Sequence, residues 1–169
     1  MSAFQEFVKT YGSGENCQPF DPTIREKYEN KLPQILLEHW QECGWCSYAQ
    51  GLIWVVNPQS FKSIIKQWFG RKTTYIVIAR TVFGQLFVWT GHAIKFVHVH
   101  YGGVSEVATD VEFLFNFGLC DRRYLDNGLD RKLFLRAIKK VGPLSPSECF
   151  GYEPALSLAL LPEVPSWRT

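Results

Sequence analysis

The sequence has no excess of either charge. It contains 18 Lys and Arg residues against 16 Asp and Glu residues, which gives a formal net charge of +2. Domains that bind phosphate backbones usually carry a concentrated basic excess, and a protein that mimics DNA has to be strongly acidic. The charge balance therefore disfavours direct nucleic-acid binding and excludes DNA mimicry.

The sequence also lacks the marks of export and of membrane insertion. The longest apolar run near the C-terminus, residues 155–161, is about a third of the roughly 20 residues that a membrane-spanning helix needs. The N-terminal residues contain no basic segment followed by an apolar one, so no signal peptide is predicted. The five cysteines are odd in number and irregularly spaced. We therefore expect a cytoplasmic protein without membrane contact, with reduced thiols rather than a disulfide framework.

Motifs of the common enzyme classes are missing. There is no G-x-S-x-G, P-loop or G-x-G-x-x-G, and no H-x-E of the kind that zinc deaminases require. The basic residues Lys62, Lys66, Arg71 and Lys72 could touch a phosphate, but the solvated face of a helix followed by a polar link is the simpler interpretation. We therefore expect no enzymatic activity and no cofactor.

The C-x-x-C at Cys43 and Cys46 resembles a redox or zinc motif, but its position argues against both. A thioredoxin-type pair opens a helix, where the helix dipole stabilises the thiolate. Here Leu36, Trp40 and Cys43 form one helical stripe that ends at Gly44, so the pair lies at the negative end of the dipole. We interpret Cys43 and Cys46 as packed side chains, with redox and metal roles as the alternatives.

Histidines supply the remaining candidates for a metal site. His98 and His100 alternate onto one face of a predicted strand, and His39 lies one helical turn before Cys43. This spacing matches no standard zinc site, and a solvated strand edge explains the two strand histidines more simply. A metal-dependent hydrolase that uses His98 and His100 is kept as an alternative function.

The chain is 46% apolar and 15% aromatic, enough for a packed core. Apolar residues at helical spacing predict an amphipathic helix that begins at Asn57-Pro58. Apolar strand patterns follow from Thr74, with a hairpin turn at Phe83-Gly84. Further helices are predicted from Thr109 and Asp130. The order predicts an α+β fold, an antiparallel sheet covered by helices with a small, mostly helical C-terminal lobe. We place the domain boundary at Gly102-Gly103, which divides the chain into residues 1–103 and 104–169.

Three stretches carry a family resemblance. "LPQILLEHWQECGW", "GLIWVVNPQSF" and "IARTVFGQLFVW" resemble the GAD-like domain, whose pattern is a Leu-Pro helix with a central Trp, a Gly-Trp, a strand that closes in Asn-Pro, and a Phe-Gly hairpin. The later stretch "VGPLSPSECFGYEPAL" is similar to the small C-terminal domain that accompanies it.

Proteins of this two-part build include the immunity partners of DNase effectors from bacterial type VI secretion systems. The resemblance therefore implies a cytoplasmic antitoxin that binds and neutralises a nuclease, with no direct contact to nucleic acid. It also implies a structural role for the cysteine pair, because Gly44-Trp45 is the recurrent element of the family pattern. A small adaptor that binds another folded protein is a further alternative.

The toxin-binding surface is predicted in the polar stretch "CDRRYLDNG", residues 120–128, which we expect to be a loop. It combines the residue types found at binding hot spots. The candidate residues are Asp121, Arg122, Arg123, Tyr124 and Asp126. The acidic members would meet the basic surface around a nuclease active site and steer association.

Overall fold

The computed structural model describes residues 3–153 and 166–168. Helices and short helical turns are α1 (Gln5–Tyr11), α2 (Pro22–Tyr28), α3 (Gln34–Cys43), η1 (Ala49–Gly51), η2 (Pro58–Phe61), α4 (Lys62–Phe69), α5 (Val111–Phe113), η3 (Leu114–Gly118), α6 (Arg122–Gly128) and α7 (Arg131–Val141). Strands are β1 (Glu15–Gln18), β2 (Trp45–Tyr48), β3 (Ile53–Val55), β4 (Ile76–Thr81), β5 (Leu86–Trp89), β6 (Ile94–His98), β7 (Gly103–Ala108), β8 (Gly151–Glu153) and β9 (Ser166–Arg168).

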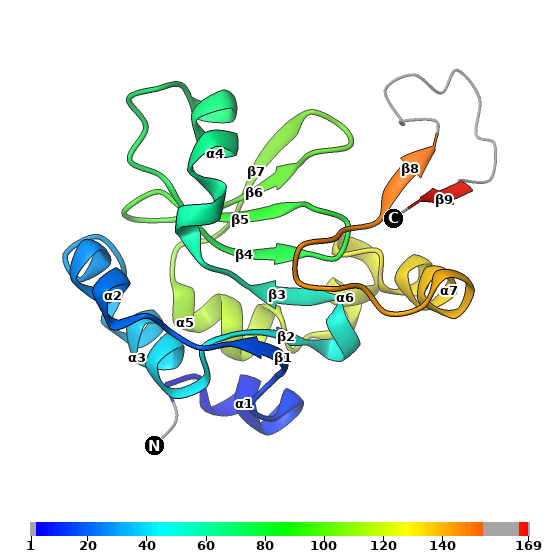
Figure 1. Cartoon of the computed structure of the whole chain (residues 1–169), viewed down its shortest axis with the longest axis horizontal. Coiled ribbons are helices and arrows are strands. Elements are labelled where there is room, and N and C mark those ends of the chain that lie inside the picture. The colour runs from blue at the N-terminus through cyan, green and yellow to red at the C-terminus, as the bar shows by residue number, and fades with distance from the viewer. Residues whose placement is uncertain (1–2, 154–165, 169) are drawn as a thin grey trace.

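The strands β1 to β7 form one antiparallel sheet in sequence order, and β8 pairs with β9 separately. Helices pack on both faces of this sheet, since Ile65 of α4 belongs to one apolar cluster and residues of α1, α3 and α5 belong to the other. Figure 1 shows α4 near the top of the view and α1 and α3 near the bottom. The predicted α+β class, an antiparallel sheet covered by helices, is confirmed. None of the helices in the described part of the chain is long and apolar enough to cross a bilayer.

The central strands are apolar on both faces. In β3, Ile53 and Val55 join the main core, whereas Trp54 between them joins a smaller cluster on the opposite face. β4 repeats this alternation, with Ile76 and Val77 on different faces. A strand that is buried on both sides has no polar positions, which explains the continuous apolar run in "GLIWVV".

The main core lies on the face of the sheet away from α4. It contains 31 buried residues, from Phe4 in the segment before α1 to Phe150 before β8. The sheet and this core continue across Gly103, because β7 pairs with β6 and the core includes Phe115 and Phe134 from the second part of the chain. The division of the chain at that position stays a prediction.

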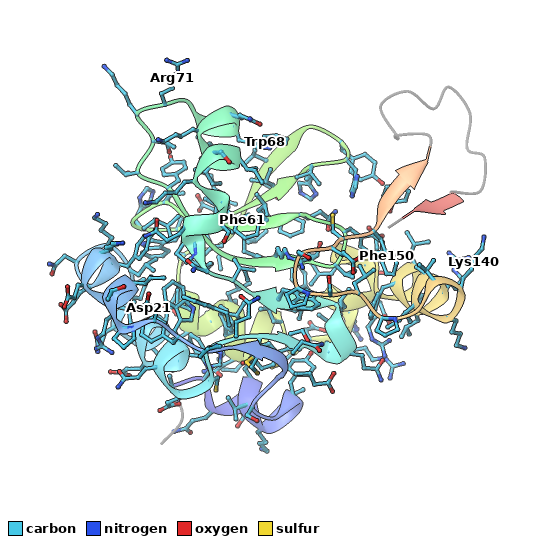
Figure 2. All side chains as sticks on the ribbon, viewed as in Figure 1. Asp21, Phe61, Trp68, Arg71, Lys140 and Phe150 are labelled. Atoms are coloured by element: carbon cyan, nitrogen blue, oxygen red, sulfur yellow. A yellow bond between two sulfur atoms is a disulfide. The ribbon has the colours of Figure 1, made fainter. Side chains whose placement is uncertain are left out.

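The opposite face is covered by α4, and its cluster contains seven buried residues. The predicted start at Asn57-Pro58 opens the short 3-10 turn η2, in which the Asn57 side chain accepts a hydrogen bond from the Gln59 N–H at 3.0 Å, and α4 itself begins four residues later at Lys62. Only Ile65 of α4 is fully buried, whereas Trp68 is half-buried and Ile64 is exposed. Figure 2 shows Trp68 on this thinly covered side of the molecule.

The expectation that the chain has no disulfide is wrong. β1 pairs with β2 across Gln18 and Trp45, which brings Cys17 against Cys46, and the two form a disulfide. This bond could not be predicted from the sequence, because β1 is short, polar and exposed and because the two cysteines lie 29 residues apart. Cys46 is fully buried as predicted, but as half of a cross-strand bond rather than as a packed thiol.

Candidate functional site

The predicted binding loop, residues 120–128, is largely helical. α6 begins at Arg122, and Asp121 is its N-cap, since its Oδ1 accepts a hydrogen bond from the Arg123 N–H at 2.7 Å. Leu125 is buried and holds the helix against the main core. The prediction of a loop is therefore wrong, because the Asp-x-x cap and the single buried leucine were enough to order this polar stretch.

Helical geometry separates the five predicted residues onto different sides of α6. Asp121 and Tyr124, three residues apart, both line a groove on one side. Arg122 lines a separate cavity of about 430 Å³ on the other side. The guanidinium of Arg122 lies 3.8 Å from the carboxylate of Asp126. Arg123 is exposed and lines neither cavity.

Asp126 has an internal partner. Its carboxylate lies 3.2 Å from the Arg131 guanidinium, and its side chain is 17% exposed. It therefore joins the end of α6 to the start of α7 rather than facing a partner protein. The structure brings together two of the five predicted residues, Asp121 and Tyr124, in a groove where they meet apolar side chains.

The groove has a volume of about 280 Å³ and lies between β7, the α5–η3 helix and α6. Its lining residues are Val107, Ala108, Phe113, Leu114, Phe117, Gly118, Asp121 and Tyr124. We call it the phenylalanine groove. Phe113 is 57% exposed and Phe117 is 59% exposed, and their ring centroids are 5.5 Å apart. Exposed apolar side chains that lie next to each other are typical of interaction sites, whereas single ones are common on any surface.

The outward position of the two phenylalanines follows from the helix that carries them. Its N–H to carbonyl bond from Leu119 to Leu114 spans five residues, so η3 is a π-helical turn. The same turn directs Phe115 inward, where its ring stacks on Phe4 at 4.4 Å and is fully buried. π-Helical turns are rare and frequently occur at functional sites.

The chain segment that supplies all the lining residues except Tyr124 is acidic, and the exposed Arg122 and Arg123 follow it in α6. From Val104 to Asp121 it contains four acidic residues, Glu106, Asp110, Glu112 and Asp121, and no basic residue. The predicted cap of this helix at Thr109 is one residue early, because Asp110 accepts the Phe113 N–H at 2.8 Å. Glu112 is exposed and directly precedes Phe113 in the chain.

Strand β7, which supplies Val107 and Ala108, is an edge strand of the seven-stranded sheet. Among the described residues it has β6 as its single strand neighbour. Its outer backbone groups are therefore available to a partner that docks in the phenylalanine groove.

His98 and His100 have separate partners. Nε2 of His98 is 3.1 Å from the Ser105 hydroxyl oxygen, and Nε2 of His100 is 2.7 Å from the Phe83 carbonyl oxygen. His98 follows Phe96 on the core-side face, as predicted. The described residues contain no group of three or more His, Cys, Asp or Glu side chains arranged to hold a metal ion.

His39 and Cys43 belong to the core and its border. His39 is fully buried, its Nε2 lies 3.1 Å from the Tyr48 hydroxyl oxygen, and burial lowers its pKa to about 4. Cys43 packs against the main core, and burial raises the pKa of its thiol. A raised thiol pKa makes a poor nucleophile, which agrees with the structural interpretation of Cys43.

The fold is similar to a known structure. The crystal structure of Atu4351 from Agrobacterium tumefaciens matches it with a TM-score of 0.72 and 18% sequence identity, over 91% of this chain and 78% of that chain. At this identity the likeness concerns the fold alone. No curated protein matches the chain in sequence.

The residues that carried the family resemblance lie mostly in ordered elements. Trp40 is in α3, Gly44-Trp45 joins α3 to β2, and Phe83-Gly84 forms the β4–β5 turn. Pro154, Ala155 and Leu156 of the C-terminal motif lie outside the described residues. Residues 2–101, more than half of the chain, match the GAD-like domain family. The chain belongs to the GAD-like domain family.

Proposed function

We propose that this protein is an immunity protein that binds and neutralises a nuclease effector through the phenylalanine groove. In this proposal it acts in the cytoplasm of the producing cell, as the antitoxin of a type VI secretion effector, and it catalyses no reaction. The observation that carries the proposal is the pair of half-exposed phenylalanines, Phe113 and Phe117, inside an acidic stretch with no basic residue.

The apolar part of the groove supplies binding energy. Aromatic side chains that become buried at the centre of an interface often contribute 2 kcal/mol or more each, on the order of a hot spot. Phe113 and Phe117 rest on a buried helix face through Leu114 and Phe115. They are therefore held in place before binding, which reduces the entropy that association has to overcome.

The charge of the groove selects the partner. A nuclease surrounds its active site with basic groups that bind phosphates. The carboxylates of Glu112 and Asp121 would meet such a surface, attract it and raise the association rate. An acidic partner would be repelled by the same groups, so the groove favours a basic protein over other folded partners.

Co-expression with the product of a neighbouring toxin-like reading frame tests the proposal. The chain should restore growth and co-purify with that protein as a stable complex. Phe113→Ser combined with Phe117→Ser should abolish both effects. Ile64→Ser on the opposite face is the matched control, because Ile64 is also a partly exposed apolar side chain, and it should retain both.

Three outcomes contradict the proposal. The first is a wild-type chain that protects no cell from the adjacent toxin, which would favour the adaptor alternative. The second is full protection by the double phenylalanine variant, which would place the toxin elsewhere on the surface. Hydrolysis of nucleic acid by the purified chain alone would contradict the absence of catalysis.

A further inference from the structure

A second open site lies between α2, α4 and the start of β4, where Tyr28 and Ile76 of the main core meet Ile65 of the α4 cluster. It is a cleft of about 410 Å³. Its lining residues are Lys27, Tyr28, Lys31, Pro58, Gln59, Phe61, Lys62, Ile65, Lys66, Thr73, Thr74, Tyr75, Ile76 and Val77. We call it the lysine cleft.

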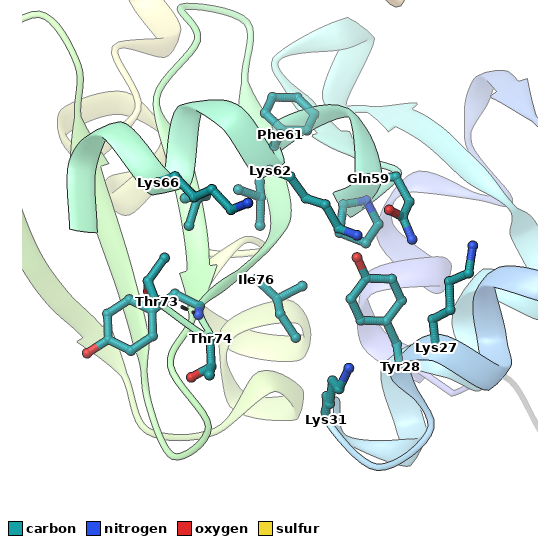
Figure 3. A pocket seen from close by; sticks show the side chains of 14 residues that line it. Lys27, Tyr28, Lys31, Gln59, Phe61, Lys62, Lys66, Thr73, Thr74 and Ile76 are labelled. Atoms are coloured by element: carbon teal, nitrogen blue, oxygen red, sulfur yellow. Dashed lines mark hydrogen bonds between the residues drawn. The ribbon is translucent and has the colours of Figure 1, made fainter. Parts of the chain in front are cut away.

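The charged side chains that line the lysine cleft are all positive. Four lysines line it, two from the α2 side and two from α4, and no Asp or Glu is among the lining residues. Figure 3 shows Lys27 and Lys31 on one side of the cleft and Lys62 and Lys66 on the other. None of the four forms an ion pair with another residue in the described ranges. Four unpaired ammonium groups around one cavity attract an anion with more than one negative charge.

The uncharged polar groups of the cleft include an unused hydrogen-bond donor. The Nε2 amide of Gln59 is buried and has no hydrogen-bond partner among the described residues. A buried amide without a partner is unfavourable, so a ligand that accepts its hydrogen bond would be stabilised. In Figure 3 the Tyr28 hydroxyl and the Lys62 ammonium are directed toward the part of the cleft beside Gln59.

The floor of the cleft is apolar and aromatic. Ile65 and Ile76 are buried beneath it, and the rings of Phe61 and Tyr75 are half-buried at its side. The Lys95 ammonium lies 5.7 Å from the centre of the Tyr75 ring and adds a fifth positive charge nearby. An inorganic anion would leave this floor unused, whereas an organic anion would cover it. The volume falls in the range of roughly 300–1,000 Å³ that is typical of small-molecule sites.

We propose that the lysine cleft binds a small organic phosphate with at least two negative charges and an aromatic or apolar body, of the size of a nucleoside diphosphate. The phosphates lie between Lys27 and Lys31 on one side and Lys62 and Lys66 on the other, and they accept the Gln59 amide hydrogen bond. The body of the ligand covers the apolar floor. Lysine binds phosphate as a point charge without a fixed geometry, which suits the arrangement of four flexible side chains around the opening.

Calorimetric titration of the full chain in EDTA with three probes tests the site. ADP should bind, while adenosine and inorganic phosphate should each bind at least tenfold more weakly, because each offers one half of the recognition. Raising the salt concentration should weaken ADP binding. If ADP gives no binding at millimolar concentration, or if phosphate alone binds as tightly as ADP, the proposal is overturned.

Substitutions locate the binding. Lys62→Gln with Lys66→Gln should weaken ADP at least tenfold, and Lys139→Gln with Lys140→Gln, two exposed lysines in the last turn of α7, should leave it unchanged. All four positions are exposed, so the variants should remain folded. Equal affinity of the two double variants would contradict the site.

Gln59→Leu separates a ligand role from a structural one. It should raise the melting temperature of the ligand-free chain, because the unpaired amide is removed, and it should weaken ADP binding severalfold. Unchanged ADP affinity in this variant would show that the amide does not meet the ligand. A DNA oligonucleotide that binds more tightly than ADP through the same lysines would replace the small-molecule site with a nucleic-acid surface.

Discussion

The two faces of the sheet are covered unequally. Side chains of motifs that resemble catalytic or metal sites are buried on one face, and open cavities reach the other. On the face that carries the main core, His39, Cys46 and Tyr48 are all buried. On the face under α4, seven buried residues form the cluster, and two cavities of about 410 and 480 Å³ reach it beside Phe61.

This difference separates stability from binding. His39 and Cys46 on the main-core face are fully buried, so no ligand reaches them whatever motif they form in the sequence. The lysine cleft beside α4 and the phenylalanine groove at the β7 edge are open to solvent. Their residues form no recognised sequence motif. The predictions that follow test this separation, from the largest expected effect to the smallest.

Matched tryptophan substitutions compare the two faces directly. Trp40→Ala removes a fully buried ring from the main core and should lower the free energy of unfolding by about 3–5 kcal/mol. Trp68→Ala removes a half-buried ring from the α4 cluster and should cost about 1–2 kcal/mol. Urea denaturation of the two variants measures both values. Equal losses would mean that α4 covers its face as completely as the helices cover the other.

The Cys17–Cys46 disulfide should contribute less to the free energy of unfolding than the Trp40 ring does, but more than any surface side chain. Closing a loop of 29 residues lowers the entropy of the unfolded chain by an amount worth about 3–4 kcal/mol. Oxidised wild type should therefore lose this stability when dithiothreitol is added. Cys17→Ser should resemble the reduced wild type and should not respond to dithiothreitol. It should still protect cells if the protein acts in the cytoplasm as proposed, because that compartment keeps thiols reduced. A wild type that is insensitive to dithiothreitol contradicts this prediction.

Burial of His39 should make the covered face sensitive to acid. Its pKa falls from 6.5 to about 4 in the folded chain, so between these values the unfolded state binds a proton that the folded state does not. Stability should therefore decrease as the pH falls from 6.5 toward 4, by about 2–3 kcal/mol, and this loss should be absent above pH 7. The rings around His39 belong to Phe4, Phe7, Tyr48 and Phe115.

Comparison with His39→Gln isolates this effect from the carboxylates that also titrate in acid. The denaturation midpoint should fall further between pH 7.5 and pH 4.5 in the wild type than in the variant. An equal fall in both proteins would show that folding does not lower the pKa of His39.

Charge at the phenylalanine groove should have the smallest effect, with a loss of folding stability limited to roughly 0.3–1 kcal/mol because Glu112 lies in the first turn of α5. Glu112→Lys is preferable to a change at Asp121 or Asp126, because Asp121 caps α6 and Asp126 pairs with Arg131. The variant should slow association with the toxin severalfold at low salt, and the difference should shrink at high salt. Glu26→Lys, an exposed position on α2, is the control and should leave the rate unchanged.

The sequence predicted the long apolar elements and missed the short polar ones. Central strands and the helices from Pro58 and Asp130 are recognisable because their apolar periods are strong. β1 is polar and fully exposed, so its pairing, and with it the Cys17–Cys46 bond, depends on contacts far apart in the chain. α6 was not predicted because Leu125 and Tyr124 alone pack it against the core, and their neighbours in the sequence are polar.

The candidate site was predicted only in part for a related reason. Asp121 and Tyr124 have the composition of a binding surface, and the structure places them in the groove. Phe113 and Phe117 belong to a stretch that is apolar at almost every position, so its periodicity does not tell which rings face solvent. That information comes from the π-helical turn, which no local sequence rule specifies.

The affinity of the purified toxin for two variants tests the proposed interface most directly. Phe113→Ser with Phe117→Ser should raise the dissociation constant at least a hundredfold, about 3 kcal/mol, while its urea midpoint stays close to that of the wild type. Ile64→Ser, on the face under α4, should change the dissociation constant less than threefold. Toxin binding that is equally tight in both variants would contradict the assignment of the phenylalanine groove as the binding surface.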